Sequence, residues 1–462
     1  MPVIRLPGLA LFLIIATSQQ AAPAQSPKFP PGGQSSANLH VLSHIPMGKA
    51  FSMTNLDIEQ DLSRPFVYAA RMRVQGLDVI DVKDPRRAAV IYSWRIESPE
   101  LHVGIGGMDA KYFKLNGRYY TALAMQFTQG GPDADLGAVV FDVTGLPNPG
   151  SVREAGRIRA GDVPGGFHNV FAYKHSDGRV LLFASNGPHA NVYDMAKFLS
   201  GDPRQGLIAM VPVPDTSGWQ VNNCHAVTCS YHDFYLGYDA ATHRDLFYGA
   251  GAGGYHIYDV SRPEEPKRIT SIAGVAGVTH GHTFTPTPDG RYAVAETEYQ
   301  YAPLRIFDLK PGVEGQVKTI SRPIGAWTAD WRGLPHNTEV RWPYVFTSSY
   351  EDGLQVINMM DPTNPYTVGY YYTWDGPHQK GYGSDQNPEG GTSIYSGAFG
   401  VDVRNADGLV VILDFNTGFW ALKMDGFDGW DGRQWGLPNV SSAQDWDHGP
   451  EGAPKITKQA SR

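Results

Sequence analysis

Cysteine, charge and long apolar runs are all scarce in this sequence. Only two of its 462 residues are cysteines, Cys224 and Cys229, which excludes a disulfide-rich scaffold. The pair can form a local disulfide, bind a metal as thiolates or remain two free thiols, and the spacing does not choose among these. Charged residues make up 18% of the chain, the net charge is −8 and no Lys/Arg-rich run occurs, so we expect no nucleic-acid partner.

Common catalytic signatures are absent as well. The sequence contains no Ser nucleophile elbow, no P-loop and no dinucleotide-binding fingerprint. Beyond the N-terminal region, no apolar run approaches the about 20 residues that a membrane-spanning helix needs. Any chemistry must therefore come from residues that the fold brings together.

Residues 1–24 have the order of a secretory signal. A single early cation, Arg5, precedes a short apolar run, and small residues follow up to Ala24. We therefore expect a signal peptide at 1–24, cleaved after Ala24. The mature protein is expected to be secreted, periplasmic or on the cell surface, with no integral membrane segment.

An internal repeat organises the rest of the chain. The 53 Gly, 34 Pro and 12% aromatic residues suit many short strands joined by tight turns. Each copy of the repeat is a Gly, an alternation of apolar residues, an Asp or Asn and a Pro-bearing turn, which predicts a strand that ends in a turn. Four clear copies lie at 76–88, 137–149, 254–266 and 353–365, and degenerate copies at 189–198, 303–312 and 418–427.

Seven copies at this spacing predict an all-β protein, a seven-bladed β-propeller. A strand-like run precedes each copy, so each blade has an inner strand, a second strand, the signature strand and a less regular outer strand. Residues 38–48 are expected to supply the outer strand of the last blade and close the ring. We place the propeller at 38–430, a disordered linker at 25–37 and a partly disordered C-terminal extension at 431–462. A two-sheet sandwich array would not explain seven matched copies.

The signature G-[LAY]-x-[VI]-[IFY]-[DN]-x-x-x-P resembles that of the LVIVD-repeat proteins, which are exported β-propellers. The resemblance covers roughly residues 50–425. It implies the propeller fold and export, and no particular activity. Two copies depart from the pattern: residues 189–191 replace the usual Gly-Leu, and Phe419-Trp420 lacks the Asp.

Four histidines share one register of the repeat. The segment GFHNVFAY (166–173) places His168 at the start of the inner strand of blade three, and His232, His282 and His336 fall at the same position in blades four to six. The innermost strands line the central channel of a propeller, so these imidazoles are expected to ring its mouth. The same alignment puts three other polar residues in this register: Asn55, Asp109 and Asp402.

Convergent imidazoles predict a metal site. Neutral imidazole is a good ligand for Fe, Cu and Zn, and nearby carboxylates can orient the rings. The arrangement is similar in architecture, though not in sequence, to the carotenoid-cleaving oxygenases, propellers in which four His bind iron. We predict that His168, His232, His282 and His336 bind a transition metal and that the site acts oxidatively or hydrolytically on a small extracellular molecule. Two alternatives stay open: an acid–base or substrate-binding role without metal, and repeat-consensus side chains that cap strand ends.

A second hypothesis uses residues of the connecting segments. His189 follows His168 in the same blade where the repeat expects Gly, and the connections between second and third strands carry Arg71 and Tyr299. A His–Tyr–Arg set is the chemistry of polysaccharide lyases: a cation neutralises the uronate carboxylate, a base removes the C5 proton, and Tyr or His protonates the leaving oxygen. In outline the chain is similar to the seven-bladed propeller ulvan lyases. This hypothesis makes His189, Tyr299 and Arg71 catalytic and the substrate an acidic polysaccharide.

The ETEYQY stretch around Tyr299 has two interpretations. Its side chains, Glu296, Glu298 and Tyr301 among them, meet the histidines if the loop folds over the channel, whereas alternating Glu and Tyr are also typical of a solvated strand edge. A third hypothesis, from another class, makes the protein a cell-surface interaction scaffold without catalysis. We expect a monomer in every case.

Overall fold

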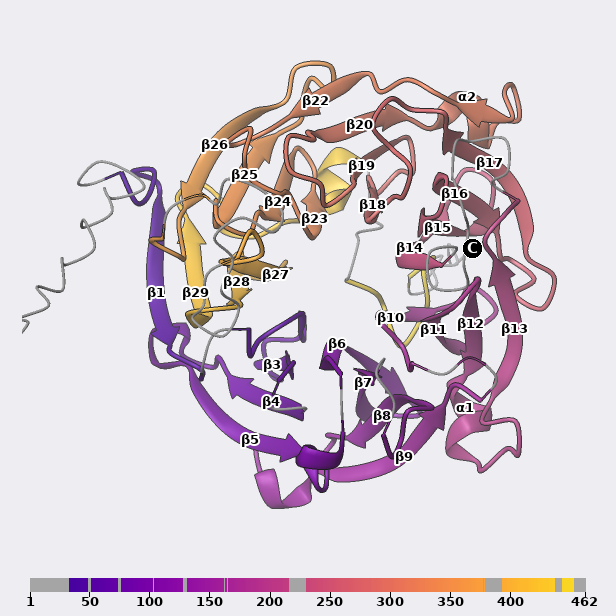
Figure 1. Ribbon diagram of the computed structural model, residues 1–462, viewed down its shortest axis with the longest axis vertical. Helices are drawn as coiled ribbons and strands as arrows, with labels where there is room; N and C mark the ends of the chain where they lie inside the picture. Colours follow the sequence, from indigo (N-terminus) through magenta and orange to yellow (C-terminus); the bar gives the residue numbers. More distant parts are fainter. Residues whose placement is uncertain are drawn as a thin grey trace, which may run out of the picture.

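The computed structural model describes residues 33–48, 51–73, 76–102, 104–127, 131–161, 163, 165–215, 230–376, 378, 393–436 and 443–452. The predicted signal peptide at 1–24, most of the predicted linker at 25–37, and Cys224 and Cys229 lie outside these residues. Within them, 29 β-strands form seven sheets arranged in a ring around a central channel (Figure 1). The predicted seven-bladed β-propeller is confirmed.

The blades follow one another along the chain, each running from the channel outward. Blade one consists of β2 (Leu56–Ile58), β3 (Phe66–Arg71), β4 (Gly76–Asp81) and β5 (Ala89–Arg95). Blade two consists of β6 (Gly106–Leu115), β7 (Arg118–Gln126), β8 (Leu136–Asp142) and β9 (Arg153–Arg159). Blade three consists of β10 (Val170–Lys174), β11 (Val180–Asn186), β12 (His189–Asp194) and β13 (Leu207–Pro212). Blade four consists of β14 (Tyr231–Asp239), β15 (Arg244–Gly251), β16 (Gly254–Asp259) and β17 (Lys267–Ala273), and β21 (Thr319–Ile320) pairs with β17 at its outer edge. Blade five consists of β18 (Thr283–Pro286), β19 (Tyr292–Glu296), β20 (Leu304–Asp308) and β22 (Gly325–Trp327). Blade six consists of β23 (Thr338–Arg341), β24 (Tyr344–Ser348), β25 (Leu354–Asn358) and β26 (Tyr366–Tyr371). Blade seven is β27 (Ala398–Arg404), β28 (Leu409–Asp414), β29 (Gly418–Met424) and β1 (Leu39–Ile45).

Every repeat signature forms the third strand of its blade, as predicted. The second and third strands are buried along nearly their whole length, because each blade packs both faces against its neighbours. The outer strand β5 is exposed or half-buried instead, which explains why the outer strands carry a weak sequence signal.

The Asp or Asn that ends a signature caps a short helix or tight turn. Asp84 accepts a hydrogen bond from the backbone N–H of Arg86, and Asn148 does the same for Gly150. Proline follows each of these caps at the first helical position, where a backbone N–H is not needed. The short helices are η1 (Pro85–Arg87), η2 (Pro99–Leu101), η3 (Pro149–Ser151), α1 (Met195–Leu199), α2 (Lys310–Val313) and η4 (Gly432–Trp435).

The ring is closed by strands from the two ends of the propeller. Strand β1 pairs antiparallel with β29, from Leu39 opposite Met424 to Ile45 opposite Phe419. Figure 1 shows the indigo β1 alongside the yellow β29. The predicted use of 38–48 as the outer strand of the last blade is confirmed.

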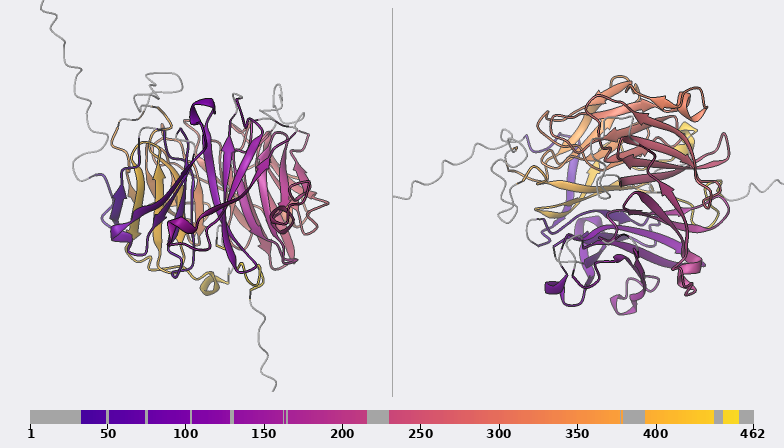
Figure 2. Two further views of the ribbon diagram at one scale, coloured as in Figure 1. Left: turned by 90° about the horizontal axis from the view of Figure 1, so that it is seen from below. Right: turned by 45° about the vertical axis from the view of Figure 1, so that its right-hand side comes forward.

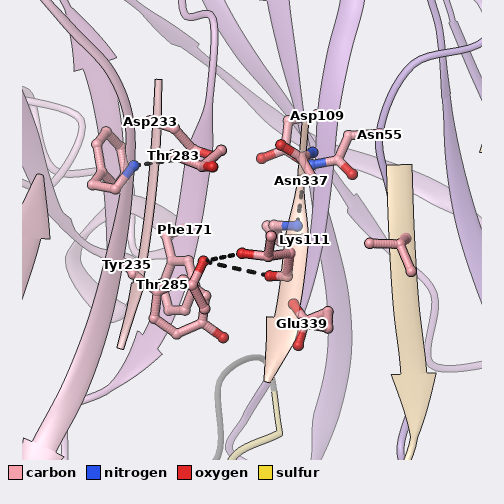
Figure 3. A pocket seen from close by; sticks show the side chains of 13 residues that line it. Asn55, Asp109, Lys111, Phe171, Asp233, Tyr235, Thr283, Thr285, Asn337 and Glu339 are labelled. Carbon is pink, nitrogen blue, oxygen red and sulfur yellow. Dashed lines mark hydrogen bonds and ion pairs between the residues drawn. The ribbon is translucent and has the colours of Figure 1, made fainter. Parts of the chain in front are cut away.

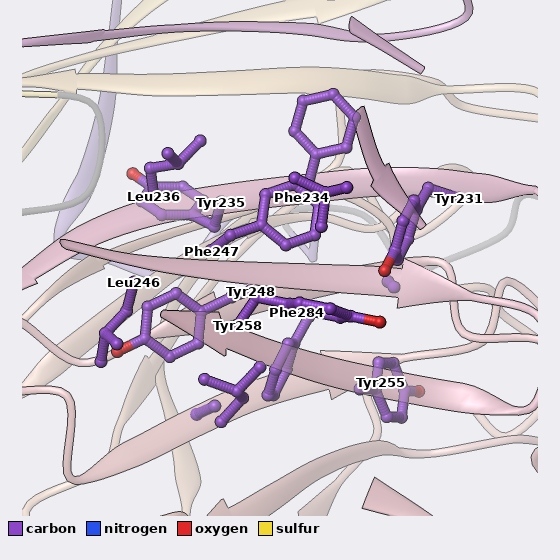
Figure 4. Packing of buried hydrophobic residues seen from close by; sticks show 14 of the residues in the cluster. Tyr231, Phe234, Tyr235, Leu236, Leu246, Phe247, Tyr248, Tyr255, Tyr258 and Phe284 are labelled. Atoms are coloured by element: carbon purple, nitrogen blue, oxygen red, sulfur yellow. The ribbon is translucent and has the colours of Figure 1, made fainter. Parts of the chain in front are cut away.

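Apolar side chains fill the spaces between blades. The largest cluster joins blades three to five (Figure 4). Phe171 of blade three packs on Tyr235 of blade four with ring centroids 4.8 Å apart, and Tyr255 of blade four packs on Phe284 of blade five at 5.2 Å. Such contacts fix each inner strand against the next and so hold the lining of the channel in place.

Within the described residues, helices are short, and none has the length and apolar character needed to cross a bilayer. The segment 443–452 packs at the far ends of the inner strands, where Gln444 hydrogen-bonds to the backbone of Ala172 and Lys174 in β10. Figure 2 shows the yellow C-terminal segment along that face of the ring.

Candidate functional site

The four predicted histidines lie side by side at one mouth of the channel. His168, His282 and His336 directly precede or nearly precede the inner strands of their blades, and His232 lies at the start of β14. Neighbouring ring centroids are 4.3 Å apart for His168 and His232, 3.9 Å for His232 and His282, and 4.6 Å for His282 and His336. The structure therefore brings the four imidazoles into one row along blades three to six.

The predicted alignment of Asn55, Asp109 and Asp402 with these histidines is wrong. His232 is the extra residue of a β-bulge between Tyr231 and Asp233, and Met108 and Phe399 occupy the same bulged position in blades two and seven. In the strand pairing, Asn55 and Asp109 lie one residue after the position that is equivalent to the histidines, and Asp402 lies three residues after it. The other members of the histidine register are Thr54, Met108 and Phe399.

Three of the four imidazoles are oriented through Nδ1. His168, His282 and His336 each hydrogen-bond an oxygen acceptor through this atom. The acceptors are, in that order, Gln126 Oε1 at 2.8 Å, a carboxylate oxygen of Glu296, and the Phe399 carbonyl oxygen at 2.7 Å. A neutral imidazole that donates from Nδ1 keeps its lone pair on Nε2. Proteins fix metal-binding histidines in this way, with a carboxylate or carbonyl behind the ring.

Glu298, from the loop between β19 and β20, adds a carboxylate to the row. One donor atom from each of His232, His282 and Glu298 lies within 4.8 Å of the other two. Glu298 Oε2 is 3.4 Å from His282 Nε2, and Glu298 Oε1 is 3.9 Å from His336 Nε2. The hydroxyl of Tyr350 donates to Glu298 Oε1 at 2.6 Å and so holds the carboxylate against the imidazoles.

Burial and the nearby carboxylates set the charge of this row. Burial lowers the pKa of His168 to about 3, and it holds the pKa values of His232 and His336 well below their ordinary range. Burial also opposes the charge of His282, but the carboxylates of Glu296 and Glu298 raise its pKa to about 9. At neutral pH the rings of His168, His232 and His336 are therefore neutral and carry ligand lone pairs, whereas His282 is protonated and must release a proton to bind a metal ion.

Two buried nitrogens of this row make no hydrogen bond within the described residues, although a Glu298 oxygen lies 3.4 Å from one of them. They are Nδ1 of His232 and Nε2 of His282, and both belong to the three-residue group with Glu298. Buried polar atoms are nearly always satisfied in native proteins. Ligation of a metal ion would satisfy both nitrogens, so the residues present fit such an ion.

The loops that carry the carboxylate are held in an uncommon conformation. Glu298 has φ 52°, Tyr301 in the same loop has φ 64°, and Tyr350 in the adjacent loop of blade six has φ 38°. The left-handed region costs a non-glycine residue about 1 kcal/mol or more, and such residues cluster at functional sites. All three belong to connections between second and third strands, which meet the histidines on this face.

A polar pocket lies in the channel directly after the histidines (Figure 3). Phe171 and Tyr235 face it from one side and Glu339 from another. Lys111 Nζ lies 3.3 Å from Asp109 Oδ1. Burial opposes the charge of Lys111, but the surrounding carboxylates raise its pKa above the ordinary value. The rim next to the histidines is formed by Asn55, Asp109, Asp233, Thr283 and Asn337.

The three residues of the lyase hypothesis are placed apart from one another. Arg71 hydrogen-bonds Ser52 and Met47 backbone oxygens and pairs with Asp78, all around blade one. His189 begins β12, two strands outward from the inner strand β10, where it pairs with Asn186 and Pro212.

Tyr299 lies in the loop of Glu298, and its hydroxyl is 3.3 Å from Thr279 Oγ1. The structure therefore brings Tyr299 to the histidine face, whereas Arg71 ends β3 of blade one and His189 begins β12 of blade three. The catalytic assignment of these three residues stays a prediction.

The sequence pattern alone does not single out Glu296, Glu298 and Gln126 as parts of the site. Of the two interpretations of the ETEYQY stretch, the structure favours a functional loop, because Glu296 is buried and bonded to His282. The signal that finds these residues is their position at the end of a second strand, for Gln126 and Glu296, or two residues beyond it, for Glu298. Tyr301, by contrast, is largely exposed.

Comparisons with known proteins support the fold alone. No family model matches the sequence, and no curated protein matches it. Among solved structures, Raptor from Chaetomium thermophilum is similar, with a TM-score of 0.53 over 84% of this chain at 11% sequence identity. The match spans 29% of that chain, well under two thirds of its length. The class that fold and site define is a seven-bladed β-propeller with a His/Glu cluster at one channel mouth.

Proposed function

We propose that this protein is an exported propeller enzyme that binds one transition-metal ion, Fe, Cu or Zn, at the channel mouth and acts on a small extracellular molecule. The ligands would come from His232, His282 and Glu298, with His168 and His336 next to them in the row. The observation that carries the proposal is the cluster of donor atoms from His232, His282 and Glu298, which lie within 4.8 Å of one another beside imidazoles that are oriented through Nδ1.

The donor set agrees with this class of ion. Two imidazoles and one carboxylate are a common protein ligand set for Zn²⁺ and for non-haem Fe(II), and additional imidazoles also suit Cu. When bound, such an ion polarises a substrate oxygen or activates a ligand for attack or oxidation.

The protein's own residues would prepare the site. Glu296 orients His282, and Tyr350 holds Glu298, so two donors are positioned before any ion arrives. The pocket next to the histidines offers amide, hydroxyl and carboxylate groups to a small polar molecule. The loops that approach the four histidines lie on the same face of the ring as the channel mouth. Proteins commonly place binding residues on such loops of a rigid scaffold.

Export and family are part of the same proposal. The order of residues 1–24 is that of a secretory signal, and the repeat signature resembles the exported LVIVD-repeat propellers. The expected location is therefore secreted, periplasmic or on the cell surface. An exported enzyme must obtain its metal outside the cytoplasm or carry it through export, which makes a preformed site with oriented ligands useful.

Metal content of the purified protein tests this proposal. After expression with Fe, Cu and Zn supplied, elemental analysis should find about one ion per chain. His282→Gln and Glu298→Gln should each lower the content at least about tenfold, since each removes a ligand. His40→Gln, which changes an exposed histidine of β1, should keep the wild-type content. Less than about 0.2 ion per chain in the wild-type protein would refute the proposal.

A further inference from the structure

Two large aromatic side chains are exposed beside the histidine row. Trp331 is 63% exposed and Tyr301 is 54% exposed, and their ring centroids lie 5.0 Å apart at an interplanar angle of 33°. Most large aromatic rings of this protein are buried between blades, so the fold does not use this pair for its core. Adjacent exposed aromatic rings commonly mark a binding surface.

The pair belongs to the same loops as the candidate site. Tyr301 lies in the β19–β20 loop, three residues after Glu298, and Trp331 lies in the β22–β23 connection, five residues before His336. The buried Gln300 joins the two loops by donating its side-chain N–H to the carbonyl oxygen of Arg332 at 3.0 Å. The two rings are thus tied to each other and to the loop that presents the carboxylate.

The backbone conformation of Tyr301 also indicates that the exposed aromatic pair has a function. Tyr301 keeps a left-handed φ of 64°, which a glycine would adopt without strain. Leaving a Trp and a Tyr in water also forgoes the free energy gained when such rings are buried. A position that carries both costs points to a use for the exposed ring.

Polar groups around the rings define the chemistry of the ligand. Arg332 forms two side-chain hydrogen bonds with Asp330, at 3.0 and 2.8 Å, so the charges of these two residues cancel. The hydroxyls of Thr279 and Tyr299 lie near the other end of the loop. This surface offers flat apolar faces and hydroxyls, and the carboxylates of Glu351 and Asp352 near Arg332 disfavour an anionic ligand. A pyranose sugar matches it, because one face of the ring presents C–H groups and its edge presents hydroxyls.

We propose that Tyr301 and Trp331 form a carbohydrate-binding platform at the channel mouth, which stacks on neutral pyranose rings. The platform deepens the proposed function, since it makes the substrate of the metal site a carbohydrate or a carbohydrate-linked molecule. Binding at the platform itself needs no metal, because both rings and their tether belong to the folded loops. The two proposals can therefore fail separately.

The test is a titration of the full-length purified protein with soluble oligosaccharides. Gluco-, manno- and galacto-oligosaccharides are added to chelator-treated and to metal-loaded protein, and binding is followed by calorimetry and Trp fluorescence. At least one series should bind, with the same Kd in both preparations. Trp331→Ala and Tyr301→Ala should each weaken binding about tenfold or more, the range typical of an aromatic contact at the centre of a site.

Trp435→Ala is the matched control, because Trp435 is also an exposed Trp, at 44%, but lies in the C-terminal η4 helix. It should leave the oligosaccharide Kd unchanged, and Trp331→Phe should retain part of the affinity. Binding that survives both alanine variants would overturn the platform. So would binding of simple phenols in place of every sugar series, or no sugar binding to a protein that does hold its metal.

Discussion

Histidine takes two different states inside this propeller, and the partner of the ring decides which. His256 in β16 is fully buried and hydrogen-bonds the Ala252 carbonyl oxygen at 2.9 Å and the Ser271 hydroxyl at 3.0 Å. Burial lowers its pKa to about 4. His282 is equally buried, yet the carboxylates of Glu296 and Glu298 raise its pKa to about 9. Burial alone therefore says little about a histidine's charge.

The low pKa of His256 predicts acid sensitivity. Between pH 6.5 and 4 the unfolded chain binds a proton at this ring and the folded chain does not, so folding stability falls as the pH drops through this window. At 1.36 kcal/mol for each pKa unit, the loss approaches about 3 kcal/mol by pH 4. His256→Gln removes the titration. The stability difference between wild type and variant, measured by urea unfolding, should thus shrink by a similar amount from pH 7 to pH 4. A difference that stays constant over this range would contradict the argument.

At the scale of the element, β1 shows how one strand closes a ring. Its first two side chains differ sharply in burial: Leu39 is 3% exposed in the core of blade seven, whereas His40 is half-exposed and pairs with Asp425. The strand is the outer edge of its blade, so its apolar face is what holds it there. The two neighbours offer a matched pair of substitutions.

Leu39→Ala should destabilise the protein by about 2–4 kcal/mol, since it leaves a cavity against Met424 and Gly369. His40→Ala should change stability by no more than about 0.5 kcal/mol, because it removes only an exposed contact. Urea unfolding midpoints measure both. Equal effects of the two substitutions would mean that β1 is not needed for closure.

The sequence predicts the elements of this fold better than their register. Alternating apolar residues and Asp-Pro turns repeat seven times, so blade number, strand order and closure follow from the pattern. The bulge that adds His232 to β14 leaves no trace in composition or periodicity, since one extra residue changes only local pairing. The place of Glu298 depends on a left-handed backbone, which no local preference of glutamate predicts. Strand register and loop conformation are set by tertiary packing, and these decide which residues meet.

At the scale of the whole molecule, the C-terminal region links blades that are far apart in the ring. Trp430 Nε1 donates to the Trp342 carbonyl oxygen in blade six. Farther along, Trp446 packs on the apolar clusters of blades one to three, and its ring centroid lies 5.9 Å from that of Tyr112. Glu451 then accepts a hydrogen bond from Tyr238 in blade four. The segment 443–452 thus acts as a brace on the face away from the histidines.

This brace predicts a contribution to stability that is separate from the site. Trp446→Ala should cost about 2 kcal/mol, less than a fully buried tryptophan would, because the ring is only partly covered. Metal content should stay at the wild-type level, since the histidine row lies at the opposite mouth. Trp435→Ala, at an exposed tryptophan of the same region, should change stability by no more than about 0.5 kcal/mol. Urea unfolding and elemental analysis of the same samples decide the matter. If Trp446→Ala left the unfolding midpoint unchanged, the segment would rest on the ring without bracing it. If it removed the metal, the two faces would be coupled through the inner strands.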